Sequence, residues 1–481
     1  MGTYKEKISK KESFAQINTK SFLIVFILLL AIIIISGFLS YVIPQGSYQR
    51  DDFGMIIDGT FVLGEIKGIS FFKVLSAPVR VFFSSDALTI IMISVLLLIM
   101  SGVFNLIEKT GGISIVIGKT VKKFSAKKRL VILVTTLVFM AFGSFFGMFE
   151  ELVTLLPLII VLVLSLGYDS LTGLGVCMMS ACFGFSAAIT NPFSVGIVAN
   201  IAHTHVFDGV WLRIIFFILV FLAVSAFLSL HIKKITKNPA KSLTFEMDRD
   251  KLNSIQYQSF NNVSNERKIF ITYAVFFCVQ LVVLVLIASI RSISGLAIPI
   301  LALSFLIGGI VCGLIICEKI SELFKYLGSG VVAMLPAVVM IALASSVKLV
   351  MTESGIIDTV MHAVISMLVG KSKFVCILLV YLLILFLQIF IGSSSAKIML
   401  IMPIILPVAT AIGLSPTIVI LTYCIADGFT DVIMPTNPVL LIGLSMAGVS
   451  YGKWVRWTWK FQLLMFAFTV LLLFFAIKIG Y

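Results

Sequence analysis

Charged residues are scarce in this sequence. Only 12% of its 481 residues are Asp, Glu, Lys or Arg, whereas 60% are hydrophobic and the mean hydropathy is +1.16. A soluble domain carries about 25% charged residues, so this chain has too few charges to cover a water-facing surface of its size. The composition predicts an all-α, polytopic protein embedded in a lipid bilayer.

Motifs for covalent catalysis and for metal binding are also missing. The sequence contains no H-E-x-x-H, G-x-S-x-G or P-loop pattern, which argues against an enzyme and against a self-contained ATP-driven pump. Its seven Cys residues form no C-x-x-C pair and lie in apolar surroundings. No metal ligand and no cofactor is therefore assigned from these motifs.

The net charge of +14 resides in three segments, residues 1–20, 109–129 and 233–268. A basic excess of this size could indicate nucleic-acid binding. Here the basic residues lie in short segments between apolar runs, which is the positive-inside pattern of cytoplasmic loops. We therefore expect no nucleic-acid partner and a multi-pass protein of a bacterial plasma (inner) membrane, with a cytoplasmic N-terminus.

Apolar runs and polar segments predict the organisation of the chain. Residues 21–43 are too long for the apolar core of a signal peptide and suffice to cross a bilayer. The expected parts are a cytoplasmic basic tail (1–20), a first transmembrane helix (21–43), an external loop (44–86), a first repeat (87–232), a cytoplasmic linker (233–268), connecting transmembrane helices (269–316) and a second repeat (317–480).

The internal repeat is visible as matched spacing. Each copy has a Pro, a Gly ten residues later and a Thr-Asn-Pro triplet, at Pro157, Gly167 and 190–192 in the first copy and at Pro403, Gly413 and 436–438 in the second. The connection at 108–129 is strongly basic, but its counterpart at 352–373 is not, so the two copies are expected to lie in opposite orientations. Inverted-topology repeats are typical of secondary transporters.

Small residues and prolines interrupt the apolar runs of each copy. Gly143, Ser144 and Gly147 form one break, and the serine run after Gly392 forms its counterpart. The Asn-Pro pairs at 191–192 and 437–438 form a second pair of breaks, because proline removes a backbone donor and opens the helix. Open backbone at membrane depth is tolerated where it is buried in protein or lines a cavity, and its carbonyl groups make Asn191 and Asn437 candidate Na⁺ sites.

Several charged residues lie within apolar sequence close to these breaks. Asp427 and Asp431 precede the second Asn-Pro pair, and Lys397 aligns by the repeat with Glu151. Intramembrane charges are costly and by default functional, although an internal ion pair of Lys397 with an acid is the structural alternative. The candidate substrate-binding residues are Gly143, Ser144, Gly147, Glu151, Thr190, Asn191, Pro192, Gly392, Ser393, Ser394, Ser395, Lys397, Asp427, Asp431, Thr436, Asn437 and Pro438.

Residues 147–170 and 183–199, together with 392–416 and 427–441, resemble the YfcC-like branch of the DcuC C4-dicarboxylate carrier family. The resemblance extends over nearly the whole chain. It implies two re-entrant hairpins, near 143–166 and 392–414, two broken helices, near 171–200 and 416–447, and an elevator-type mechanism. It also implies a homodimer by analogy.

These observations predict a secondary active transporter of a small charged organic solute. The acids near the breaks outnumber the bases, which favours a substrate with a positive group, or coupling to Na⁺ or H⁺. The resemblance to the YfcC-like branch implies a basic amino-acid exchanger of the arginine/ornithine type. The resemblance leaves a C4-dicarboxylate carrier as the alternative. An ion channel is a further alternative, because broken helices can also line a pore.

Overall fold

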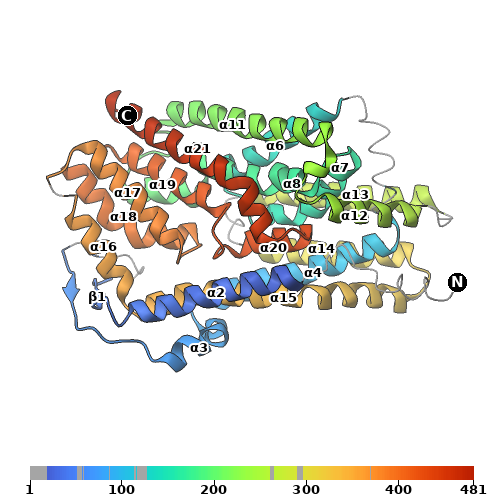
Figure 1. Cartoon of the computed structure of the whole chain (residues 1–481), viewed down its shortest axis with the longest axis horizontal. Coiled ribbons are helices and arrows are strands. Elements are labelled where there is room, and N and C mark those ends of the chain that lie inside the picture. The colour runs from blue at the N-terminus through green and yellow to red at the C-terminus, as the bar shows by residue number, and fades with distance from the viewer. Residues whose placement is uncertain are drawn as a thin grey trace.

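The computed structural model describes residues 19–50, 57, 59–85, 87–112, 115, 127–259, 265–289, 296–368 and 370–481. Most of these described residues are helical, as Figure 1 shows. Seven helical segments are long and apolar enough to cross a bilayer: Ala87–Lys109, Lys128–Phe146, Val210–Lys237, Ile298–Ile316, Ile320–Glu353, Ser394–Ala411 and Tyr451–Lys478. The protein is therefore an all-α polytopic membrane protein, as its composition predicts. Most of the predicted basic tail lies outside the described residues.

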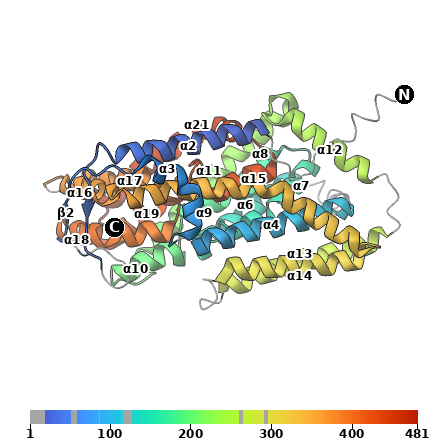
Figure 2. The same cartoon turned by 90° about the horizontal axis from the view of Figure 1, so that it is seen from below.

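Five long helices pack along one another and are here called the α15 layer. They are α2 (Thr19–Leu39), α4 (Ala87–Lys109), α13 (Glu266–Ser289), α14 (Ala297–Ile316) and α15 (Ile320–Glu353). Helix α15 contacts both α2 and α4, while α14 bridges α4 and α13. Figure 2 shows these helices running side by side.

Helices α4 and α15 approach closely because glycine stands at their crossing. A Cβ atom on Gly330 would lie 2.4 Å from the carbonyl oxygen of Ser101. The Ser101 hydroxyl donates to the carbonyl of Gly330 (2.8 Å), and the Asn105 amide donates to the carbonyl of Tyr326 (2.6 Å). Small residues and interhelical hydrogen bonds are what hold helices together in lipid, where burial of apolar surface adds little.

The remaining long helices form a second body, here called the repeat bundle. Its first part comprises α6 (Lys128–Ala141), η3 (Phe142–Phe146), η4 (Glu151–Leu155), α7 (Leu156–Ser165), α8 (Ser170–Leu174), η5 (Gly175–Met179), α9 (Ser180–Ser186), η6 (Pro192–Gly196), α10 (Ile197–Ile201) and α11 (Val210–Lys237). Its second part comprises α17 (Lys373–Gln388), α18 (Ser394–Ala411), α19 (Pro416–Asp431), α20 (Pro438–Ala447) and α21 (Tyr451–Lys478).

The two parts of the repeat bundle share one order of elements. A shift of 246 residues, the interval from Asn191 to Asn437, carries η6 and α10 onto α20 and the α8–α9 segment onto α19. The turns at Gly167 and Gly413 correspond under the same shift, and both glycines have positive φ, 87° and 75°. The opposite orientation of the two copies stays a prediction.

The predicted external loop 44–86 contains short elements of its own. Strand β1 (Gly46–Ser47) pairs antiparallel with β2 (Val62–Leu63), and α3 (Phe71–Arg80) continues into η1 (Val81–Phe83). This segment is tied to α15 and to α16 (Ile356–Ser366) by ion pairs of Arg80 with Glu353 (2.5 Å) and of Arg50 with Asp358 (3.0 Å). The described part of this segment therefore contains short helices and a strand pair.

The predicted linker also contains helix. After α11 the chain forms η7 (Pro239–Lys241) and α12 (Phe245–Ser259) before it enters α13. On α12, Asp248 accepts a hydrogen bond from the backbone amide of Ser170 (2.9 Å), and Lys251 donates to the carbonyl of Ala447 at the end of α20. The linker thus docks on both parts of the repeat bundle.

Candidate functional site

Asparagine caps the helix that follows each Asn-Pro break. The side-chain oxygen of Asn191 accepts from the amide of Phe193 (2.8 Å), and that of Asn437 accepts from the amide of Val439 (2.9 Å). These caps satisfy amide groups that the helix itself leaves without partners. Proline in the next position suits the first helical turn, because no donor is needed there. The sequence therefore forms the same break twice by local rules.

The first copy holds its two breaks together through backbone groups. Helix α6 runs into the π-helical turn η3, and the carbonyl of Ser144 within this turn accepts from the amides of three consecutive residues, 189–191, at 3.1–3.3 Å. The Ser144 hydroxyl also donates to the carbonyl of Ala187 (2.6 Å). At Gly143 a Cβ atom would lie 2.2 Å from the carbonyl oxygen of Ala181, so only glycine permits this approach.

The second copy holds its breaks together through a carboxylate. Asp431, the last residue of α19, accepts hydrogen bonds from the side-chain amides of Gln388 and Asn437, the latter at 3.1 Å. The Thr436 hydroxyl donates to the carbonyl of Gln388 (3.3 Å). Ser393 caps α18, whose amide end faces the same region. The first copy has Phe185 at the position that corresponds to Asp431.

A cavity of about 430 Å³ lies between the repeat bundle and the α15 layer. Small-molecule sites are typically concave and of about 300–1,000 Å³. Ten of the predicted site residues line it: Gly147, Glu151, Gly392, Ser393, Ser394, Ser395, Asp431, Thr436, Asn437 and Pro438. The sequence thus located one wall of this cavity.

The other predicted residues do not line the cavity. Four of them belong to the backbone contacts of the first copy described above: Gly143, Ser144, Thr190 and Asn191. Pro192 is the first residue of η6. Lys397 and Asp427 are fully buried within the repeat bundle and form an ion pair with each other.

Four cavity-lining residues are charged. Glu150, Glu151 and Asp431 come from the repeat bundle, and Lys348 comes from α15 on the opposite side. The helix N-termini at Ser394 and Pro438 also face the cavity, and each presents partial positive charge. The cavity therefore combines carboxylates with anion-attracting helix ends.

Sequence reasoning missed the contribution of the α15 layer. Lys348 could have been found from the sequence, because it is the one charged residue in the apolar run between Lys325 and Glu353. The other lining residues of this layer are uncharged, and Thr89 and Ser345 are the polar ones among them. Glu150 is not among the predicted site residues, although it also lines the cavity. The aromatic lining residues were not singled out either: Phe149, Phe185, Phe193 and Phe390.

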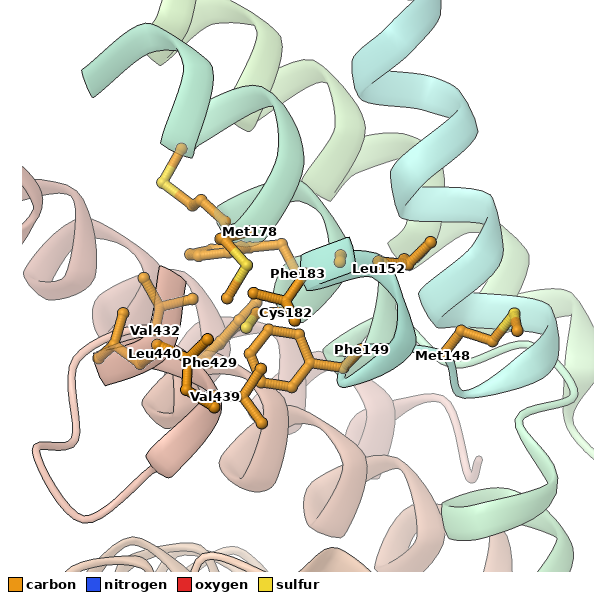
Figure 3. Close-up of a cluster of buried hydrophobic side chains, with 14 of the residues drawn as sticks. Met148, Phe149, Leu152, Met178, Cys182, Phe183, Phe429, Val432, Val439 and Leu440 are labelled. Atoms are coloured by element: carbon orange, nitrogen blue, oxygen red, sulfur yellow. The ribbon is translucent and has the colours of Figure 1, made fainter. Parts of the chain in front are cut away.

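At the cavity wall and beneath it, apolar side chains from the two copies pack together. Figure 3 shows Phe149 and Phe183 of the first copy beside Phe429 and Val439 of the second. The ring centroids of Phe183 and Phe429 are 4.8 Å apart. This buried cluster contains residues of both copies and so joins them into one packed unit.

The cavity holds no evident metal-binding cluster. Among the described residues, no three His, Cys, Asp or Glu side chains gather in a way that could bind a metal ion. Backbone carbonyls can also bind Na⁺. The Na⁺ sites predicted at Asn191 and Asn437 therefore stay predictions.

Comparison with known proteins agrees with a transporter. The chain is 24% identical over 382 residues to a protein of Escherichia coli named "Putative basic amino acid antiporter YfcC", covering 76% of this chain and 74% of that protein. It is 26% identical over 369 residues to an uncharacterized protein of Haemophilus influenzae, covering 76% and 71% respectively.

Two solved transporters align along most of the chain at low similarity. The Alcanivorax borkumensis YdaH transporter covers 96% of this chain and 98% of its own at 17% identity, with a TM-score of 0.41. Neisseria gonorrhoeae MtrF covers 94% of both chains at 15% identity, with a TM-score of 0.42. We build no argument on similarity of this degree.

The family model for the C4-dicarboxylate anaerobic carrier, DcuC, matches residues 20–478, which includes both copies of the repeat and every residue that lines the cavity. With seven helices able to span a membrane, this match makes the chain a membrane transporter. The protein belongs to the DcuC family of C4-dicarboxylate carriers.

Proposed function

We propose that this transporter exchanges basic amino acids, of the arginine/ornithine type, across a bacterial inner membrane. The observation that carries the proposal is the charge of the cavity, where three carboxylates face one lysine. Glu151 and Asp431 are only 9% and 7% exposed. Carboxylates with so little access to water favour a ligand that brings its own positive charge.

The same cavity offers a place for the remaining part of an amino acid. A solute carboxylate fits the N-terminus of α18, where Ser393 and Ser394 line the cavity, because the backbone amides there attract anions. The cationic group then lies towards Asp431. The basic amino-acid name of the Escherichia coli relative supports this choice.

A C4-dicarboxylate is the second candidate. The family description names this class. Lys348 and the helix ends at Ser394 and Pro438 are the groups that would receive two carboxylates. In that case Glu150 and Asp431 would carry protons or a coupling ion instead of binding substrate.

Movement of the repeat bundle against the α15 layer is the proposed mechanism. The cavity lies between these two bodies, so a displacement of one against the other would expose it to alternate sides of the membrane. The inverted orientation of the copies would supply two states of similar energy. A homodimer stays a prediction.

Uptake into proteoliposomes tests the function. Vesicles preloaded with ornithine receive labelled arginine, and vesicles preloaded with succinate receive labelled succinate. Arginine uptake that depends on internal ornithine supports the proposal, whereas succinate exchange alone overturns it in favour of the second candidate. Passive flux that does not saturate would indicate a channel. Glu246→Gln serves as the control variant, because Glu246 lies on the exposed face of α12.

A further inference from the structure

The ion pair of Lys397 with Asp427 is fully buried in the repeat bundle. Lys397 lies in the first turn of α18 and Asp427 lies in α19, and both side chains are 0% exposed. Nζ of Lys397 contacts Oδ1 of Asp427, and neither residue lines the cavity. The proposed function uses neither of them to bind substrate.

Stability gives no reason for this pair. Replacing a buried ion pair by well-packed apolar residues is often neutral or stabilising. Lys397 also lies close to the N-terminus of α18, where the helix dipole disfavours a cation. Burial and the helix dipole both disfavour a charged lysine at this position. We therefore look for a functional role of Lys397.

The pair is incompletely satisfied by its surroundings. Within the described ranges, Oδ2 of Asp427 and Oε1 of Gln388 accept no hydrogen bond, although both side chains are 0% exposed. Buried acceptors of this kind are expensive unless a ligand or cation reaches them. Oxygen atoms of carboxylates and amides are also the ligands that hard cations prefer.

Asp431 connects the pair to the cavity. It follows Asp427 by four residues, which places both carboxylates on one face of α19. Asp431 lines the cavity and interacts electrostatically with Asp427, Lys397 and Glu150. A change in the charge of the pair therefore changes the electrostatic potential in the cavity.

The repeat itself does not require these charges. At the corresponding positions the first copy has Glu151, Ala181 and Phe185 in place of Lys397, Asp427 and Asp431. The two copies share the order of their elements and the positions of their breaks, although η5 and η6 of the first copy are π-helical where the second copy has α19 and α20. The framework of the repeat therefore forms in the first copy without a Lys–Asp pair at these positions.

We propose that the Lys397 ammonium is a built-in cation, which takes the place of a coupling Na⁺ at Asp427, four residues before Asp431 on α19. A cation tethered to α18 neutralises the carboxylates but cannot leave with the substrate. The transporter then needs no Na⁺ gradient, which fits exchange of one solute for another. The part of this inference that concerns exchange rests on the proposed function, whereas the cation site does not.

Removal of the ammonium tests the site without substrate. In purified Lys397→Met protein, the unpaired Asp427 carboxylate needs a new counter-ion. We expect NaCl to raise the Tm of this variant by several degrees over equimolar choline chloride, because an ion that binds only the folded state stabilises it. The Tm of the unchanged protein and of the double variant Lys397→Met/Asp427→Asn should respond equally to the two salts.

Exchange measurements on the unchanged protein give a second test that needs no variant to fold. The exchange rate should be the same in NaCl and in choline chloride. Strict dependence of exchange on Na⁺ would overturn the inference. The inference would also fail if the Tm of the Lys397→Met protein were the same in NaCl and in choline chloride. If no solute is exchanged at all, the proposed function fails, while the Tm comparison still decides whether a latent cation site exists.

Discussion

Asn191 and Asn437 occupy equivalent places in the two copies of the repeat, but their side chains have different partners. The Asn191 side-chain amide donates to a backbone carbonyl, that of Gly143, at 3.5 Å. The Asn437 amide donates to the carboxylate of Asp431 at 3.1 Å. The first break is therefore closed by backbone groups, whereas the second is built around a charge.

This difference separates the roles of the two copies. Backbone closure at Ser144 needs tight packing and tolerates little change, because several amides converge on one carbonyl. The carboxylate of Asp431 lines the cavity and can respond to a ligand or proton. The comparison teaches that a repeat can duplicate a framework and still give its two copies different charged groups, Glu150 and Glu151 in the first and Asp431 in the second.

The largest expected effect is that of Asp431→Asn. The change removes a charge from the cavity and weakens the hydrogen bonds from Gln388 and Asn437. Hydrogen bonds to charged groups contribute about 1.5–3 kcal/mol, so we expect exchange to fall by about tenfold or more. The measurement is the initial rate of counterflow, compared with Glu246→Gln. An unchanged rate would place the chemistry elsewhere.

The paired variants Asn191→Ala and Asn437→Ala come next. Both remove a helix cap, at a cost of about 0.5–2 kcal/mol, and both should abolish most transport while the protein still inserts into the membrane. Asn437→Ala should lose more, because it also releases Asp431. Counterflow rates normalised to membrane-inserted protein test this order. Full activity in both variants would contradict the assignment of the site.

Gly143→Ala and Gly392→Ala should differ in stability. A Cβ atom at Gly143 would lie 2.2 Å from a backbone oxygen of α9, whereas at Gly392 the nearest atom would be 3.4 Å away. Overpacking costs about 1–3 kcal/mol, so Gly143→Ala should lower the Tm clearly and Gly392→Ala should leave it nearly unchanged. Equal Tm values would show that the first copy is less tightly closed than its contacts indicate.

The smallest expected effect concerns the docking of α12. Burial lowers the pKa of Lys251 to about 8, although the nearby Asp248 opposes the shift. In the unfolded state the pKa of Lys251 is 10.5, so Lys251 stays protonated there to a higher pH than in the folded state. The stability of the docked helix should therefore rise between about pH 8 and pH 10.5. Hydrogen-exchange protection of 245–252 should increase from pH 7.5 to pH 9.5. Lys251→Met should remove this dependence.

Two sequence-based expectations need refinement in the light of the structure. The segment 44–86 was expected to be a loop but contains α3, because ion pairs from Arg50 and Arg80 hold it against α16 and α15. Lys397 and Asp427 were grouped with the substrate-binding residues. Packing instead turns them towards each other, away from the cavity.

The sequence by itself determined the membrane class, the positions of the helix breaks and the matching order of the two copies. These follow from hydropathy, from proline and from asparagine caps, which act over a few residues. Only the tertiary structure decided that Asp431 faces the cavity while Asp427 pairs with Lys397, and that Lys348 completes the site from α15. Such choices depend on side chains brought together from helices far apart in the sequence, and local physics does not contain that information.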